Sequence, residues 1–269
     1  MIKMNSQIRE FFRVDKLDQP HFQKVRFLNE ENDLQWQDVE KIGLPRGWYE
    51  LSRISNLDRV EFLKEFWLTR LSYHPKATSL IENFFDKLDD IVVLICRQTE
   101  EDPWQAELVY SLADNSTFFR GLAPAFDDEI DFEKKGIRSE LPQDYWSFFK
   151  LHNGFGRLSK LGFMPLNRLR EARDQLRERV LQSDKILRFG SSKIDPYSLF
   201  PFYEEYGVAS FQCFNAEWYP TSEMGNVYFS GIDFTLSDIS IPSAAEENMA
   251  FATFLEWLAA FLHGMNRTL

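Results

Sequence analysis

The chain has 269 residues, 44% of them hydrophobic, which is enough for two modest domains or one large one with a buried core. Its net charge of −11, from 31 basic and 42 acidic residues, would repel a phosphate backbone. We therefore expect no nucleic-acid binding and favour a protein partner with a basic surface. The two cysteines, Cys96 and Cys213, lie far apart in apolar runs, which is typical of free thiols in a reducing compartment.

Membrane-targeting signals are missing from the sequence. No stretch reaches the ~18 consecutive apolar residues of a membrane-spanning helix. Residues 1–14 carry charges every few positions instead of the apolar run of a signal peptide. We therefore expect a soluble, cytoplasmic protein without a membrane partner.

Two helices are predicted in the N-terminal half. Ser55, with Asp58 three positions later, is typical of a capping box, and it opens a helix over residues 55–71. The His74-Pro75 pair breaks this helix, and the apolar spacing predicts a second helix over residues 76–88.

Strands follow these helices. Residues 91–96 form a run of apolar, largely β-branched side chains, which predicts a central strand covered on both faces. Two further strands over 106–112 and 117–122 complete a small meander. Residues 1–45 mix scattered aromatic side chains with charges and predict no element. Together these stretches indicate an α+β module over residues 1–126.

Residues 127–133 (Asp-Asp-Glu-Ile-Asp-Phe-Glu) place five acids within seven positions. Blocks of like charge repel and stay extended, so the favoured interpretation is a solvated linker between two domains. The other interpretation is an acidic contact strip for a basic partner.

Residues 141–154 are the most clearly delimited element of the chain. Pro142 suits the first position of a helix and Gly154 its end, while aromatic side chains recur between them at three- and four-residue spacing. We predict a short helix that docks on a core. Its aromatic face consists of Tyr145, Phe148, Phe149 and His152, and the helix C-terminus would modestly favour the charged form of the histidine.

The C-terminal half predicts an antiparallel or mixed sheet with helices. Strands are expected over 157–163, 199–203, 208–214 and 226–230, and a charged helix with a narrow apolar stripe over 166–183. A last helix over 251–262 would be capped by Asn248 and ended by Gly264. The fold class of the whole chain is therefore predicted to be α+β.

Several short motifs occur in this half in a fixed order. They are Leu141, Pro142, Tyr145, Phe148, His152, Asn153 and Gly154, then Leu166 to Leu169, Gly225 to Phe229, and Phe251 to Leu255. Their order and spacing over residues 136–263 resemble the SUKH superfamily, which includes Syd, fungal cell-wall-assembly regulators and immunity proteins of bacterial toxin systems. The chain departs from that pattern in having Gly154-Phe155-Gly156 in place of a glycine pair, and in its longer charged helix.

The resemblance implies an α+β domain over residues 136–269, with a curved sheet and packed helices, acting as a binding module without chemistry of its own. It makes the aromatic residues of 141–154 core anchors. We recognise no family in residues 1–126.

Residues with catalytic or metal-binding chemistry are scattered. The four histidines lie far apart, and the chain lacks a phosphate-binding glycine loop and a Gly-x-Ser-x-Gly motif. We therefore expect no metal and no cofactor. A thiol–imidazole pair of Cys213 and His152 would require that the fold bring the two together, and structural roles are favoured for both.

Two groups of residues are candidates for binding a partner. Trp218 and Tyr219 follow Glu217 in a loop and can anchor another protein, although a place at the rim of the core explains them equally well. An acidic cluster would form if neighbouring strands brought four carboxylates together, and the alternative is acidic turn residues. The cluster would consist of Glu204, Glu205, Glu217 and Asp233.

The charge, the motifs and the scattered chemistry favour a non-enzymatic protein that binds a basic partner through an acidic groove, as an immunity protein or a regulatory adaptor does. The alternative is a hydrolase with a site where the two domains meet.

Overall fold

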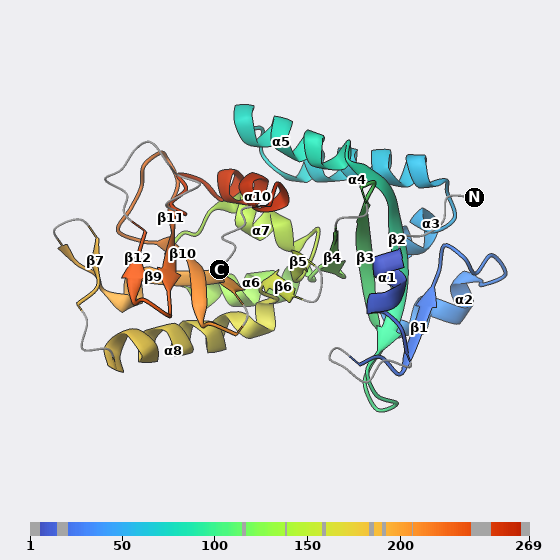
Figure 1. Ribbon diagram of the computed structural model, residues 1–269, viewed down its shortest axis with the longest axis horizontal. Helices are drawn as coiled ribbons and strands as arrows, with labels where there is room; N and C mark the ends of the chain where they lie inside the picture. Colours follow the sequence, from blue (N-terminus) through green and yellow to red (C-terminus); the bar gives the residue numbers. More distant parts are fainter. Residues whose placement is uncertain are drawn as a thin grey trace. The chain divides into compact units, whose positions relative to one another are not determined.

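The structure is a computed structural model that describes residues 6–14, 21–114, 117–137, 139–157, 160–182, 186–189, 192–205, 207–237 and 249–264. It contains helices and antiparallel strands, which confirms the α+β prediction (Figure 1). The chain divides into two compact units. Unit 1 comprises Met1–Thr69, Glu82–Pro124 and Leu151–Leu161, and unit 2 comprises Arg70–Ile81, Ala125–Lys150 and Gly162–Leu269. Both units are discontinuous, in contrast to the contiguous domains 1–126 and 136–269 that we expected.

Unit 1 contains a meander in which each strand is antiparallel to the next. The strands are β1 (Lys24–Phe27), β2 (Leu88–Arg97), β3 (Gln105–Leu112), β4 (Phe118–Leu122) and β5 (Phe155–Arg157). The strands predicted over 91–96, 106–112 and 117–122 are thereby confirmed.

Both faces of β2 are covered, as the sequence predicted for a central strand. Val92 and Leu94 belong to a cluster with residues of α1 (Ser6–Phe11), the helix that lies over β2 and β3 in Figure 1. On the opposite face Tyr110 of β3 contacts Trp67 and Phe85, with ring centroids 5.8 and 6.2 Å apart.

The helices α4 (Asn56–Arg70) and α5 (Pro75–Phe85) begin close to where they were predicted. The Asp58 N–H donates to the Ser55 hydroxyl at 3.2 Å, and this hydroxyl donates to the Asp58 carboxylate at 2.6 Å, so the helix start at Ser55 is confirmed. Residues 1–45, for which no element was predicted, also contain short helices. These are α2 (Trp36–Val39) and η1 (Glu40–Ile42), followed by α3 (Arg46–Leu51).

Unit 2 contains a second antiparallel arrangement of strands. Its members are β6 (Lys160–Phe163), β9 (Leu199–Glu205), β10 (Ser210–Asn215), β11 (Asn226–Ser230) and β12 (Thr235–Leu236). Three predicted strands are confirmed, whereas the strand expected over 157–163 is divided between β5 and β6. The short strands β7 (Arg188–Phe189) and β8 (Ser192–Lys193), and η2 (Pro196–Ser198), precede β9.

The helices of unit 2 are α6 (Asp127–Lys135), α7 (Gln143–Phe149), α8 (Leu166–Gln182) and α10 (Phe254–Leu262). Tyr145 of α7 lies at the centre of the core, and its ring is 5.0 to 5.9 Å from five phenylalanine rings. The predicted core role of the aromatic residues Tyr145, Phe148 and Phe149 is confirmed, because all three are fully buried.

The structure corrects the linker predicted over residues 127–133 and the limits predicted for the helix after Pro142. The acidic residues 127–133 are helical, because acids in the first turn and Lys134 and Lys135 in the last interact favourably with the helix dipole. Helix α7 has Pro142 as its N-cap and ends at Phe149, so His152 lies beyond it.

Helix α10 begins after Thr253, whose hydroxyl accepts a hydrogen bond from the Glu256 N–H at 3.1 Å. Asn248, the predicted cap, lies outside the described residues. Gly264, with a φ of 77°, follows the end of the helix as expected.

Among the described residues, no helix has both the length and the apolar composition needed to cross a bilayer.

Candidate functional site

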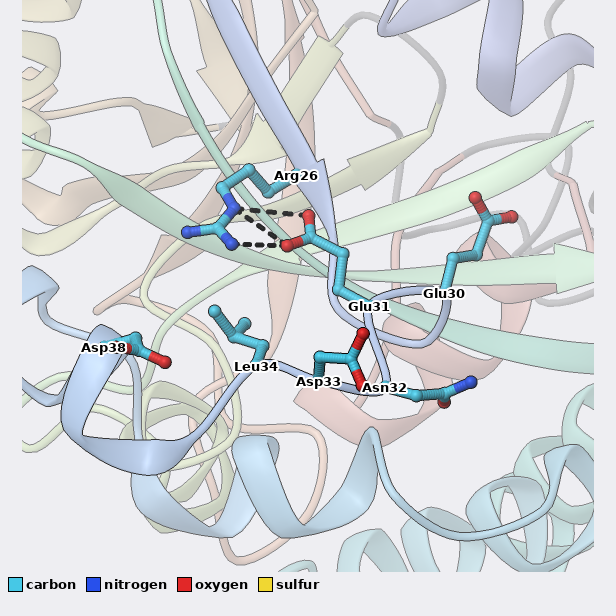
Figure 2. Close-up of a pocket in the computed structure, with 7 residues that line it drawn as sticks. All are labelled: Arg26, Glu30, Glu31, Asn32, Asp33, Leu34 and Asp38. Carbon is cyan, nitrogen blue, oxygen red and sulfur yellow. Dashed lines mark hydrogen bonds and ion pairs between the residues drawn. The ribbon is translucent and has the colours of Figure 1, made fainter.

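An acidic hollow opens on unit 1 in the segment between β1 and α2 (Figure 2). Its volume is about 570 Å³. The lining residues are Arg26, Glu30, Glu31, Asn32, Asp33, Leu34 and Asp38. These side chains include no thiol, hydroxyl or imidazole, so the hollow offers mainly carboxylate and amide oxygens to a ligand.

The loop that forms the acidic hollow is anchored by the Asn29 side chain and by hydrogen bonds to the loop backbone. Asn29 accepts a hydrogen bond from the Val93 N–H of β2 at 2.8 Å and donates to the Ile91 carbonyl at 3.1 Å. The Arg53 guanidinium donates to the carbonyl oxygens of Glu31 and Leu34, at 2.8 and 3.1 Å. Because these contacts use the Asn29 side chain and backbone carbonyl groups, and Leu34 is the buried side chain of the loop, the carboxylates of Glu30 and Asp33 remain exposed.

The charges of the acidic hollow are only partly compensated. Arg26 donates its Nε to both carboxylate oxygens of Glu31, at 3.0 and 3.2 Å, and Figure 2 shows this pair facing each other. Glu30 is paired with Arg9, which lies outside the lining. Asp38 accepts a hydrogen bond from the Gln35 N–H at 2.9 Å. Within the described part of the chain, the exposed carboxylate of Asp33 has no hydrogen-bond or ionic partner.

We did not predict this site, because it lies in the weakly patterned residues 1–45. A signal was nevertheless present. Glu30, Glu31 and Asp33 stand between two leucines, Leu28 and Leu34, that are both buried. An acidic run bracketed by anchoring apolar residues is a pattern that places carboxylates together on a fixed loop.

The six predicted partner-binding residues lie in unit 2 and are separated into two groups by β10. Glu204 and Glu205 pair with the first residues of β10, and Asp233 follows the end of β11 that lies beside the same residues. The other group follows the opposite end of the strand, roughly 17 Å away for a six-residue strand. It consists of Glu217, Trp218 and Tyr219.

Contacts within unit 2 occupy most of the first group. Glu205 accepts a hydrogen bond from the Tyr228 hydroxyl at 2.5 Å, and Glu204 lies 3.6 Å from the Arg168 guanidinium. The Asp233 carboxylate accepts from the Ser230 hydroxyl at 3.3 Å. These residues do not form the free acidic cluster that the sequence suggested.

The loop after β10 is folded against itself. The Gly225 N–H donates to the Trp218 carbonyl, and a Cβ at Gly225 would lie 2.4 Å from the Trp218 ring, so the indole packs directly against this glycine. Tyr219 is 53% exposed and Glu217 is also exposed. Trp218 is therefore better explained by packing within the loop, and Tyr219 remains available for contact with a partner.

His152 is a buried structural residue of unit 1. Its Nδ1 lies 3.0 Å from the Leu122 carbonyl, which can only accept, so Nδ1 carries the proton. Its Nε2 then accepts from the Tyr110 hydroxyl at 2.6 Å, and this hydroxyl accepts from the Trp67 indole N–H at 3.2 Å. Burial lowers the pKa of His152 to about 4, so the expectation of a favoured charged form is wrong. Both ring nitrogens are occupied, which argues against a pairing with Cys213.

Other polar groups also have structural roles. Burial raises the pKa of the Cys96 and Cys213 thiols, which makes both poor nucleophiles at neutral pH. In unit 2, Asp144 accepts from the Ser72 N–H at 2.7 Å and Glu223 from the Phe254 N–H at 2.9 Å. Burial, above all, raises the pKa of Glu223. Within the described residues, no group of three or more His, Cys, Asp or Glu side chains is placed to hold a metal ion.

Comparison with protein-family models gives no match to this chain, and comparison with curated proteins gives none either. The SUKH resemblance therefore remains a prediction from the sequence motifs over residues 136–263.

Proposed function

We propose that this protein is a non-enzymatic, cytoplasmic binding protein that holds a basic segment of a protein partner in the acidic hollow, in the manner of an immunity protein or a regulatory adaptor. The observation that carries the proposal is the partly compensated acidity of a concave, anchored loop. Four carboxylates line it. Glu31 is bound by Arg26 and Glu30 by Arg9, while the exposed carboxylate of Asp33 has no partner within the described residues. The net charge of −11 favours the same kind of partner, because opposite charge accelerates encounter.

The SUKH-like motifs over residues 136–263 support this class of function, since proteins of that superfamily include toxin-neutralising and adaptor proteins. The side chains that line the hollow also agree with a binding role. They include carboxylates that can accept hydrogen bonds from lysine and arginine.

The proposal is tested with a charge reversal in the acidic hollow and a matched reversal elsewhere in unit 1. Asp33→Lys changes an exposed carboxylate of the hollow, and Glu100→Lys changes an exposed carboxylate outside it, so both variants carry a net charge of −9 instead of −11. Each tagged chain is used to recover proteins at low salt from the cells in which the chain naturally occurs, and these proteins are identified by mass spectrometry.

We expect one basic protein to be recovered by the wild type and by Glu100→Lys, and to be lost with Asp33→Lys. Loss in both variants would mean that only the overall charge matters, and equal recovery by all three chains would place the binding surface elsewhere. Either result, or the recovery of no partner at low salt, would reject the proposal.

A further inference from the structure

Helix α6 buries only Ile130 among its side chains, although a surface helix ordinarily buries a stripe of apolar ones. Three of its charged side chains make contacts within unit 2. Asp127 lies 2.7 Å from Lys150, Glu133 lies 3.8 Å from Arg173, and the Lys134 ammonium lies 5.5 Å from the centre of the Trp146 ring. The aromatic side chains are left in solvent instead. Phe132 is 67% exposed, and Phe126, the N-cap, is 73% exposed.

The outer face of α6 combines an aromatic ring with acidic side chains. Asp128 and Glu129 precede Phe132 by four and three positions, which makes them its neighbours on the helix surface. Glu129 is occupied by the Phe126 N–H at 2.8 Å. The exposed carboxylates of Asp128 and Asp131 have no side-chain partner within the described part of the chain, and exposed Lys135 ends the face.

We propose that this outer face of α6 is a second docking surface, which receives an arginine of a protein partner together with an apolar side chain next to it. A guanidinium can stack on the Phe132 ring while the carboxylate of Asp128 compensates its charge, and the rest of the exposed ring covers the apolar neighbour. The inference goes beyond the proposed function, because α6 belongs to unit 2 and the acidic hollow to unit 1.

Other occupants fit the charges poorly. A second copy of the chain, docked on the same face, would bring the carboxylates of Asp128 and Asp131 against one another, and like charges across an interface are unfavourable. An anionic membrane surface would repel the same carboxylates. A cationic segment with apolar character satisfies both the ring and the carboxylates.

The test uses the full chain and a short fluorescein-labelled peptide in which arginine alternates with leucine. Binding is followed by fluorescence anisotropy, and the bound site is located by hydrogen exchange of the α6 amides. Phe132→Ala should weaken binding about tenfold, the loss expected from one cation–π contact and its apolar neighbour. Asp128→Asn should weaken it less and reduce its salt dependence. The control is Leu181→Ala, which removes a 63% exposed side chain of α8.

The expected result is protection of the α6 amides by the peptide, loss of this protection in Phe132→Ala, and unchanged binding by Leu181→Ala. Equal binding by Phe132→Ala and the wild type, or equal binding of a glutamate–leucine peptide, would overturn the inference. Asp33→Lys is included to separate the two surfaces. If it abolishes peptide binding while Phe132→Ala does not, the acidic hollow is the binding site and the inference about α6 is wrong.

Discussion

Acidification should weaken unit 1 through His152. The ring contacts Trp48, Trp67, Tyr110 and Phe155. Its Nε2 can accept a hydrogen bond from the Tyr110 hydroxyl only when the imidazole is neutral. A proton on Nε2 would face the Tyr110 hydroxyl, which would then have to stop donating to it. Burial of the ring is the larger cause of the lowered pKa, and the Leu122 carbonyl opposes it.

The size of the effect follows from the two pKa values. The unfolded chain binds a proton at the ordinary histidine pKa of about 6.5, whereas the folded chain does so only at about 4. Because the folded pKa is the lower one, the unfolded state gains protons first as the pH falls. The stability associated with neutral His152 is fully present above the unfolded pKa and is lost progressively down to the folded pKa. Between neutral pH and pH 5 the loss amounts to about 2 kcal/mol.

Hydrogen exchange of the amides of β2 and β3 in urea, corrected for intrinsic exchange rates, measures the free energy of opening of unit 1 at each pH. The same measurement is made on His152→Gln, whose residue 152 cannot titrate. The difference between the two chains cancels the contributions of the carboxylates that both contain. His21→Gln, a partly exposed histidine in the same unit, is the matched control. The wild type and the control should lose about 2 kcal/mol more than His152→Gln on acidification. Identical pH dependence in all three chains would refute the reasoning.

Two further predictions concern groups inside each unit. Arg120→Ala should lower the stability of unit 1 by about 3–5 kcal/mol, because it leaves the carboxylate of Glu107 buried without its partner. Hydrogen exchange of the β3 amides measures this loss, and an unchanged exchange rate would show that the Arg120–Glu107 pair does not contribute to the stability of unit 1. Thr253→Ala should lower the stability of α10 by about 1 kcal/mol, because it removes the N-cap hydroxyl. Hydrogen exchange of the α10 amides measures this loss. Thr253→Ser, which keeps a hydroxyl, should retain most of the stability.

The elements that were predicted correctly are those whose patterns report burial directly. β2 is apolar along its whole central part because both of its faces are covered, and α8 shows the apolar period of a helix with one buried side. Helix α6 was missed because its single buried residue, Ile130, gives no period. The charge pattern suggested a repelling linker, yet the same acids stabilise the start of a helix once Lys134 and Lys135 are placed at its end.

The acidic hollow could not be located from local patterns, because its shape depends on partners that are distant in sequence. Asn29 is fixed by atoms of β2 more than sixty positions away, and Arg53 reaches the loop from the residues after α3. The predicted cluster around Glu204 fails for the related reason that neighbouring groups, such as Arg168 and the Tyr228 hydroxyl, were invisible in its own segment. Spacing along the chain indicates which residues share an element, but not which acids already have partners.

The net charge of −11 indicates what kind of partner to expect, and the contacts indicate where such a partner can bind. Carboxylates that are already bonded inside the protein contribute little to recognition. Glu107 is buried against Arg120, and Asp144 accepts a backbone N–H. Two exposed acids without a side-chain partner in the described part of the chain lie at the proposed surfaces. Asp33 stands beside a concave surface, and Asp128 of α6 stands beside an exposed aromatic ring. Shape or apolar area next to uncompensated charge distinguishes a binding surface from a solvated one, because charge alone in water is strongly screened. Variants that change a charge, such as Asp33→Lys, and a variant that removes an aromatic ring, Phe132→Ala, should therefore affect partner binding in different ways. If only the net charge of the chain mattered, Phe132→Ala would leave binding unchanged.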